Sequence, residues 1–162
     1  MNLVFLKKSR KKPEVGDVFV FQLIFEPEQY RFGMVVCTTM KIVSMENVTL
    51  VYIYDHLGNN KDDHPDFSKK KLLLPPQAIN NLGWSSGFFE TVAHLDLEVH
   101  PEYRLPQHHF RWPVHANRTD YFDEFNNEIT TPIEPIGMHG LGNYRTVEDK
   151  VCDKLGYPLS KD

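Results

Sequence analysis

Residues 15–25 have the sequence VGDVFVFQLIF, an apolar run rich in β-branched and aromatic side chains. After Asp17 only Gln22 interrupts this run. Side chains of these kinds favour strands, and a short apolar run that does not alternate with polar residues is typical of a strand buried on both faces. The stretch therefore predicts a strand covered on both sides, as in a small closed barrel or at the centre of a sheet.

Two more strand-like segments follow after short connections. Residues 30–37 have the sequence YRFGMVVC, and residues 48–54 have the sequence VTLVYIY. Consecutive strands that are joined by short turns pair with one another in antiparallel fashion. We therefore expect an antiparallel meander of three strands, near residues 17–25, 30–37 and 47–54.

The clearest helix signal lies in residues 146–155. Thr146 is expected to cap the helix, with Asp149 three residues later as in a capping box. Gly156 is expected to end the helix. Apolar residues recur every four positions, at Val147, Val151 and Leu155. They share one face of the helix, which we expect to pack on the sheet.

Shorter segments complete the expected fold. Residues 77–83 predict one or two helical turns, because proline precedes them and glycine ends them. Residues 88–99 predict a further strand, and residues 120–129 predict a hairpin that turns at two asparagines. The expected class is α+β and β-dominated: an antiparallel meander sheet or a partly open small barrel, with one or two short helices, one at the C-terminus.

The chain is expected to form one domain over residues 1–162. Within it we distinguish a basic N-terminal segment (1–14), a β-rich body (15–129) and a loop followed by the C-terminal helix (130–162). A length of 162 residues with 41% hydrophobic residues is enough for a sizeable single core.

Composition also limits the partners and the compartment. Eighteen Lys and Arg against 22 Asp and Glu give a net charge of −4, which argues against a strongly basic nucleic-acid-binding protein. The two cysteines have no Cys-x-x-Cys spacing, and the sequence shows neither a signal peptide nor a long apolar run. We therefore expect a cytoplasmic protein without a membrane segment.

Motifs of common enzymes are absent. The sequence has no Gly-x-Ser-x-Gly elbow, no phosphate-binding P-loop and no dinucleotide fingerprint, and neither cysteine lies in a recognisable nucleophile context. We therefore expect a protein that is not an enzyme and that needs no cofactor.

One alternative is a metal-dependent hydrolase. Strict alternation along the predicted strand 88–99 would place His94, Asp96 and His100 on one face, and imidazole and carboxylate groups suit zinc or a transition metal. Successive side chains on one face lie about 7 Å apart, however, whereas metal–ligand bonds are near 2 Å. A half-exposed strand with a polar outer face is therefore the favoured interpretation.

A second alternative is a small nucleic-acid-binding β-barrel. The basic run at residues 7–12 would contact phosphates, and aromatic residues such as Phe32 and Tyr52 would stack on bases. The net charge of −4 argues against this function.

Two segments combine acidic side chains with aromatic or imidazole rings. Such a surface suits the basic cleft of a nucleic-acid-processing partner, because the rings anchor the contact while carboxylates replace phosphates. The first is the predicted loop 55–66 and the second is the predicted hairpin at 120–125. The partner-binding candidates are Asp55, His56, Asp62, Asp63, Asp66, Tyr121, Phe122, Asp123 and Glu124.

The order of several short motifs resembles the immunity protein 26 family, bacterial proteins encoded beside polymorphic toxins. The resemblance covers residues 13–125, and the segment 130–162 has no counterpart in the pattern. The motifs are Gly16-Asp17-Val18-Phe19, Tyr30-Arg31-Phe32-Gly33, Tyr52-Ile53-Tyr54-Asp55, Leu73-Leu74-Pro75-Pro76, Gly83, Arg104-Leu105-Pro106 and Phe110-Arg111.

The resemblance implies a non-catalytic protein that binds and neutralises a cognate toxin domain. It carries over no contact residues, because the family has no agreed toxin-binding motif. If the toxin is a nuclease, the acidic segments above are the expected contact surface, with Tyr121 and Phe122 as anchors. Neither the motifs nor the composition determines the oligomeric state.

Overall fold

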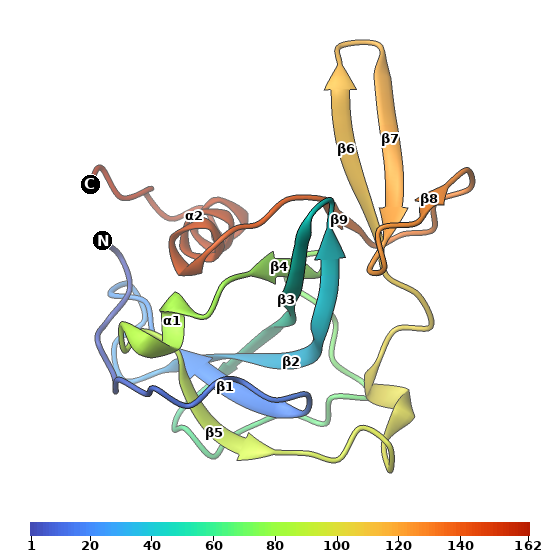
Figure 1. Cartoon of the computed structure of the whole chain (residues 1–162). Coiled ribbons are helices and arrows are strands. Elements are labelled where there is room, and N and C mark those ends of the chain that lie inside the picture. The colour runs from blue at the N-terminus through green and yellow to red at the C-terminus, as the bar shows by residue number, and fades with distance from the viewer.

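The computed structural model describes residues 1–162 and consists of two β-sheets, two α-helices and one short 3-10 helix (Figure 1). The β-dominated α+β class is confirmed, as is a helix near the C-terminus. The elements are β1 (Asp17–Phe21), β2 (Tyr30–Ile42), β3 (Met45–Gly58), β4 (Gln77–Ile79), α1 (Leu82–Ser85), β5 (Glu90–His94), η1 (Pro101–Tyr103), β6 (His109–His115), β7 (Arg118–Asp123), β8 (Glu128–Ile129), β9 (Ile136–Met138) and α2 (Tyr144–Leu155).

The larger sheet contains the expected meander. Its strand order is β4-β3-β2-β1-β5, and β1 pairs with β2, and β2 with β3, in antiparallel fashion. Phe19 lies opposite Gly33, and Met34 lies opposite Tyr52. The two edge strands, β4 and β5, do not pair with each other, so the sheet is not closed into a barrel.

The central strands are buried on both faces, as the apolar run in residues 15–25 predicts. All five residues of β1 are buried. Successive side chains of a strand point to opposite faces, so alternate residues of β1 enter two separate cores. The first core includes Phe19, Phe21, Val35, Val51, Ile53, Trp84, Phe89, Val147 and Val151. The second core includes Val18, Val20, Phe32, Met34, Leu50, Tyr52, Tyr54, Phe67 and Phe110.

Helix α2 covers the first core. Val147 and Val151 are fully buried there and Leu155 packs at its margin, so the predicted apolar face is confirmed. The predicted cap is wrong by three residues, because Asn143 is the N-cap and accepts hydrogen bonds from the amides of Arg145 and Thr146. Thr146 instead accepts a hydrogen bond from the Asn143 amide and completes the capping box.

Two predicted segments differ in the structure. Residues 77–79 form β4 rather than a helical turn, because Gln77–Ile79 pair with the edge of β3, and the helix begins only at Leu82. Strand β5 ends at His94, and residues 96–100 form a turn that is closed by a hydrogen bond of 3.0 Å from the His100 amide to the Asp96 carbonyl. The strict alternation expected over 94–100 is therefore wrong.

The smaller sheet has the order β8-β7-β6-β9 and contains a parallel pair, β6 with β9. The hairpin expected at residues 120–129 is confirmed as β7 and β8, with Tyr121 opposite Ile129. A longer hairpin of β6 and β7 projects away from the rest of the molecule (Figure 1). We call residues 109–123 the projecting hairpin.

Candidate partner-binding site

A chain of polar contacts, centred on one buried hydrogen bond, fixes the base of the projecting hairpin to the larger sheet. The Tyr52 hydroxyl, on β3, lies 2.6 Å from Nε2 of His108, the residue before β6. Nδ1 of His108 lies 3.6 Å from Oε2 of Glu124, the residue after β7. The Leu105 amide donates to the same Tyr52 oxygen at 2.9 Å. These contacts therefore connect the core of the larger sheet to both ends of the projecting hairpin.

The direction of this chain follows from its donors. Because Tyr52 already accepts from Leu105, its own hydrogen is free to donate to Nε2 of His108. With Nε2 assigned as the acceptor, the ring proton lies on Nδ1, facing Glu124. Burial raises the pKa of Tyr52 to about 12, which keeps the hydroxyl protonated. Burial is the largest single influence on Glu124 and acts to raise its pKa, but the contacts with His108, a backbone hydrogen bond and nearby His109 together outweigh it and hold that pKa below its usual value.

The projecting hairpin exposes apolar side chains. Residues 110 and 112 of β6 point to the same side, and Val114 lies where the β6–β7 register shifts between Pro113 and His115. Phe110, at the base, is fully buried in the second core, whereas Trp112 is 47% exposed and Val114 is 44% exposed. Trp112 lies opposite Asp120 of β7. Sequence reasoning missed Trp112 and Val114, although the alternation of apolar residues in HFRWPVH is a signal for such a face.

The carboxylates of this region have partners within the chain. Arg118 donates to both oxygens of Asp120, at 3.0 and 3.2 Å. Asp123 accepts from the amides of Phe125 and Asn127 and so builds the β7–β8 turn. Glu124 contacts His108. The hairpin therefore presents fewer free negative charges than its sequence implies.

Of the two aromatic candidates on β7, Phe122 is engaged and Tyr121 is more available. The Phe122 ring stacks on His139 with the ring centres 4.4 Å apart. Tyr121 is half-buried opposite Arg111, and no ring stacking involves it. Tyr121, Trp112 and Val114 are thus the hairpin side chains that are best placed for an outside contact.

The other predicted segment, 55–66, is only in part a loop. Asp55 and His56 belong to β3, which continues to Gly58. Asp63 accepts from the Asn59 amide, and two hydrogen bonds from Ser68, one from its hydroxyl and one from its amide, hold the pKa of Asp66 below its usual value. Asp62 is exposed and its carboxylate has no partner. Figure 1 shows this segment and the projecting hairpin on opposite sides of the molecule.

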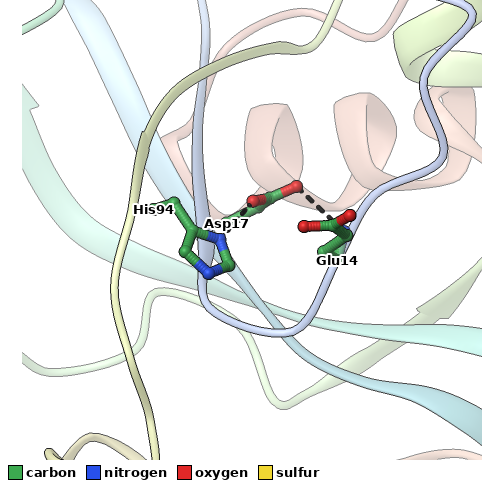
Figure 2. A group of neighbouring side chains, drawn as sticks. All are labelled: Glu14, Asp17 and His94. Atoms are coloured by element: carbon green, nitrogen blue, oxygen red, sulfur yellow. Dashed lines mark hydrogen bonds and ion pairs between the residues drawn. The ribbon is translucent and has the colours of Figure 1, made fainter.

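The predicted metal-binding set is not brought together. The closest group of three or more His, Cys, Asp or Glu side chains is Glu14, Asp17 and His94, whose ligand atoms lie within 4.8 Å of one another (Figure 2). It contains neither Asp96 nor His100, because β5 ends at His94.

This group has an explanation that needs no ion. Asp17 is buried, its Oδ1 accepts from Nδ1 of His94 at 2.8 Å, and its Oδ2 accepts from the Glu14 amide at 2.9 Å. Both carboxylate oxygens are therefore occupied in closing the turn before β1 and in pairing β1 with β5.

The alternative of nucleic-acid binding relies on base stacking against Phe32 and Tyr52. Nucleic-acid bases have no access to these two rings, because both are buried in the second core.

A scan against protein-family models matches residues 14–116 to Immunity protein 26, which is more than half of the chain. The chain belongs to the immunity protein 26 family. The family match includes Tyr52, His108, Trp112 and Val114, and it ends at the tip of the projecting hairpin. The second strand of the hairpin, β9 and α2 lie outside the matched residues.

The other comparisons add no relatives. Neither a search of curated proteins nor a search of solved structures found a match. Neither helix has the length and the apolar run that a membrane crossing requires.

Proposed function

We propose that this protein neutralises the toxin domain encoded beside its gene by binding it, without catalysis, in the bacterial cytoplasm, and that the projecting hairpin makes the principal contact. One observation carries the proposal: in this member of an immunity protein family, a projecting hairpin leaves Trp112 and Val114 exposed. Exposed aromatic side chains at the centre of a contact supply most of the binding energy in protein interfaces.

The polar contacts among Tyr52, His108 and Glu124 support a binding role. Because these contacts fix both ends of the hairpin, little conformational entropy is lost when a partner contacts the tip. A preorganised hairpin of this kind is suited to tight and specific binding.

The decisive experiment is a titration of toxin activity. A binding inhibitor abolishes activity at one equivalent and no further, whereas an enzyme that destroys or modifies the toxin acts at far below one equivalent. We expect inhibition to be complete at a ratio of about one to one. Full inhibition at a small fraction of one equivalent would overturn the non-catalytic proposal.

A matched pair of variants tests where the toxin contacts this protein. Val114→Ala should weaken toxin binding, whereas Val99→Ala, at a valine that is 66% exposed outside the hairpin, should not. Tyr121→Ala should also weaken toxin binding, by raising the rate at which the complex dissociates.

The segment 55–66 is the second candidate surface. Changing Asp62 and Asp63 to Lys should slow association and reduce its salt dependence if the toxin is a basic nuclease that docks there. If that double variant alone changes binding and the hairpin variants do not, the contact lies at 55–66 and the hairpin placement is wrong.

A further inference from the structure

A basic pocket lies between α2 and the smaller sheet, away from the exposed face of the projecting hairpin. It has a volume of about 230 Å³ and is formed by β4, β6, β9 and α2. An adjoining hollow of about 200 Å³ shares Gln77, Met138 and Lys150 with it. The charged residues that line the pocket are Arg111, Lys150, Lys154 and Asp153.

None of the three cations takes part in an ion pair, and two of them, Arg111 and Lys150, contact neutral acceptors. Lys150 donates to Oε1 of Gln77 at 2.9 Å, and Arg111 directs its Nε to the sulfur of Met138 at 3.2 Å. Neither side chain takes part in any ion pair of the structure. A thioether is a weak acceptor, so most of the donors of the Arg111 guanidinium are free to contact a ligand.

The position of Lys150 is built by the fold. Gln77 is buried in β4, and its amide nitrogen donates to the Pro75 carbonyl at 2.7 Å, which directs its oxygen toward Lys150. Burial and, after it, the charge of Arg111 hold the pKa of Lys150 below its usual value. Two cations kept near each other without an ion-pair partner of their own are electrostatically unfavourable, and an anion between them removes the penalty.

We propose that this pocket binds a phosphate group, with Arg111 as a fork-shaped donor and Lys150 as a point charge. A guanidinium donates two parallel hydrogen bonds to an oxyanion, and an ammonium adds charge without fixed geometry. Three cations against the one carboxylate of Asp153 leave an excess of two positive charges, which matches a dianion better than a monoanion. The proposal is independent of toxin binding, because it rests on a different face of the hairpin and on α2.

The first test is thermal unfolding of the whole protein with inorganic phosphate, with a small phosphate monoester, and with acetate at equal ionic strength. Both phosphate compounds should raise the melting temperature in a saturable way, and acetate should not. A larger effect of the monoester would identify an esterified phosphate as the better ligand. Equal effects of acetate and phosphate would overturn the proposal, because they would reflect ionic strength alone.

Variants locate the binding. Arg111→Gln and Lys150→Met should each weaken phosphate binding by about tenfold or more, as expected for loss of a charged hydrogen bond. Arg10→Gln removes the same charge from an exposed arginine outside the pocket and should leave affinity unchanged. Asp153→Asn should strengthen binding by about two- to fivefold, as expected for removal of an exposed like charge. Because Arg111 is exposed, its variant should fold even if that of Lys150 does not.

A spectroscopic measurement completes the design. The pKa of Lys150, followed by NMR of its side chain, should rise when phosphate is added, because a bound anion favours the charged ammonium. A saturable phosphate effect that persists in both the Arg111 and the Lys150 variants, or a Lys150 pKa that does not move, would overturn the proposal.

Discussion

In the larger sheet all five residues of β1 are buried, whereas in the smaller sheet β6 has five exposed residues in succession, from Arg111 to His115. Both strands contain aromatic and β-branched side chains. β1 is covered on one face by α2 and on the other by the second core, while the outer half of β6 is covered on neither. The comparison indicates that similar strand sequences are buried in a core in one place and left exposed in the other, according to what packs against them.

The largest expected effect is on the larger sheet. Phe19 packs against Trp84 and Phe89, with ring centres 5.0 Å away in both cases. Phe19→Ala should lower the free energy of unfolding by about 3–5 kcal/mol, because it removes buried area and leaves a cavity. Urea denaturation measures the loss. A loss below about 1 kcal/mol would show that this core is less tightly packed than the structure indicates.

The next effect separates binding from stability. Trp112→Ala should weaken toxin binding by about 2 kcal/mol or more, as for an aromatic residue at the centre of an interface. The same variant should change the free energy of unfolding by no more than about 0.5 kcal/mol, because the side chain is half exposed. Calorimetric titration and urea denaturation of one preparation give both numbers, and a large stability loss would remove the distinction between the sheets.

A third experiment addresses the connection between the two regions. Tyr52→Phe removes the hydroxyl shared by Leu105 and His108 and should cost about 1–3 kcal/mol, because the buried His108 ring and the part-buried Leu105 amide lose their partner. Amide hydrogen exchange at the hairpin base should become faster.

Tyr54→Phe is the matched control for this variant. Tyr54 is as deeply buried as Tyr52, but its hydroxyl contacts only the sulfur of Met34, at 3.9 Å. We expect a smaller loss of stability and no change in exchange at the hairpin base. Equal effects of the two substitutions would show that the hydrogen-bond chain contributes nothing specific.

The smallest expected effect is a pH dependence at His139, which holds the hairpin region to β9. Its Nε2 contacts Asn126 at 2.9 Å, its Nδ1 is buried without a partner, and burial holds the pKa of His139 below its usual 6.5. Because the folded pKa is lower, the unfolded chain takes up the proton first as pH falls. The stabilising contribution is therefore full above pH 6.5 and declines below it.

His139→Gln should reduce this pH dependence, measured as the urea midpoint at about pH 7.5 and about pH 5.5. His64→Gln is the control, since His64 is exposed. If the parent and the His139 variant lose the same stability over this range, His139 is not the group that titrates.

The sequence predicts those parts of the fold that depend on local pattern. The meander follows from the apolar run in residues 15–25, and the α2 face follows from the spacing of Val147 and Val151. The sequence does not predict β4, because that strand forms only through pairing with the edge of β3. The predicted cap lies three residues too late because Asn143 and Thr146 are both good capping residues.

The candidate site was harder to predict for a related reason. Acidic residues at 120–124 suggest free charge, yet Arg118 and His108 already contact Asp120 and Glu124. Tyr52 and His108 are 56 positions apart in sequence, so no spacing rule connects them. Composition thus predicts a candidate region of the chain, whereas the availability of each side chain depends on long-range contacts.

Helix α2 is synthesised after every strand that it covers. About 50 residues separate the end of β5 from the start of α2, so at ordinary translation speeds the first core stays uncovered for about 3–10 seconds on the ribosome. During that time the apolar face with Phe19 and Phe21 is open to chaperones and to other nascent chains. Slower growth at low temperature and co-expressed chaperones should therefore raise the soluble yield of this protein more than any change to the finished surface.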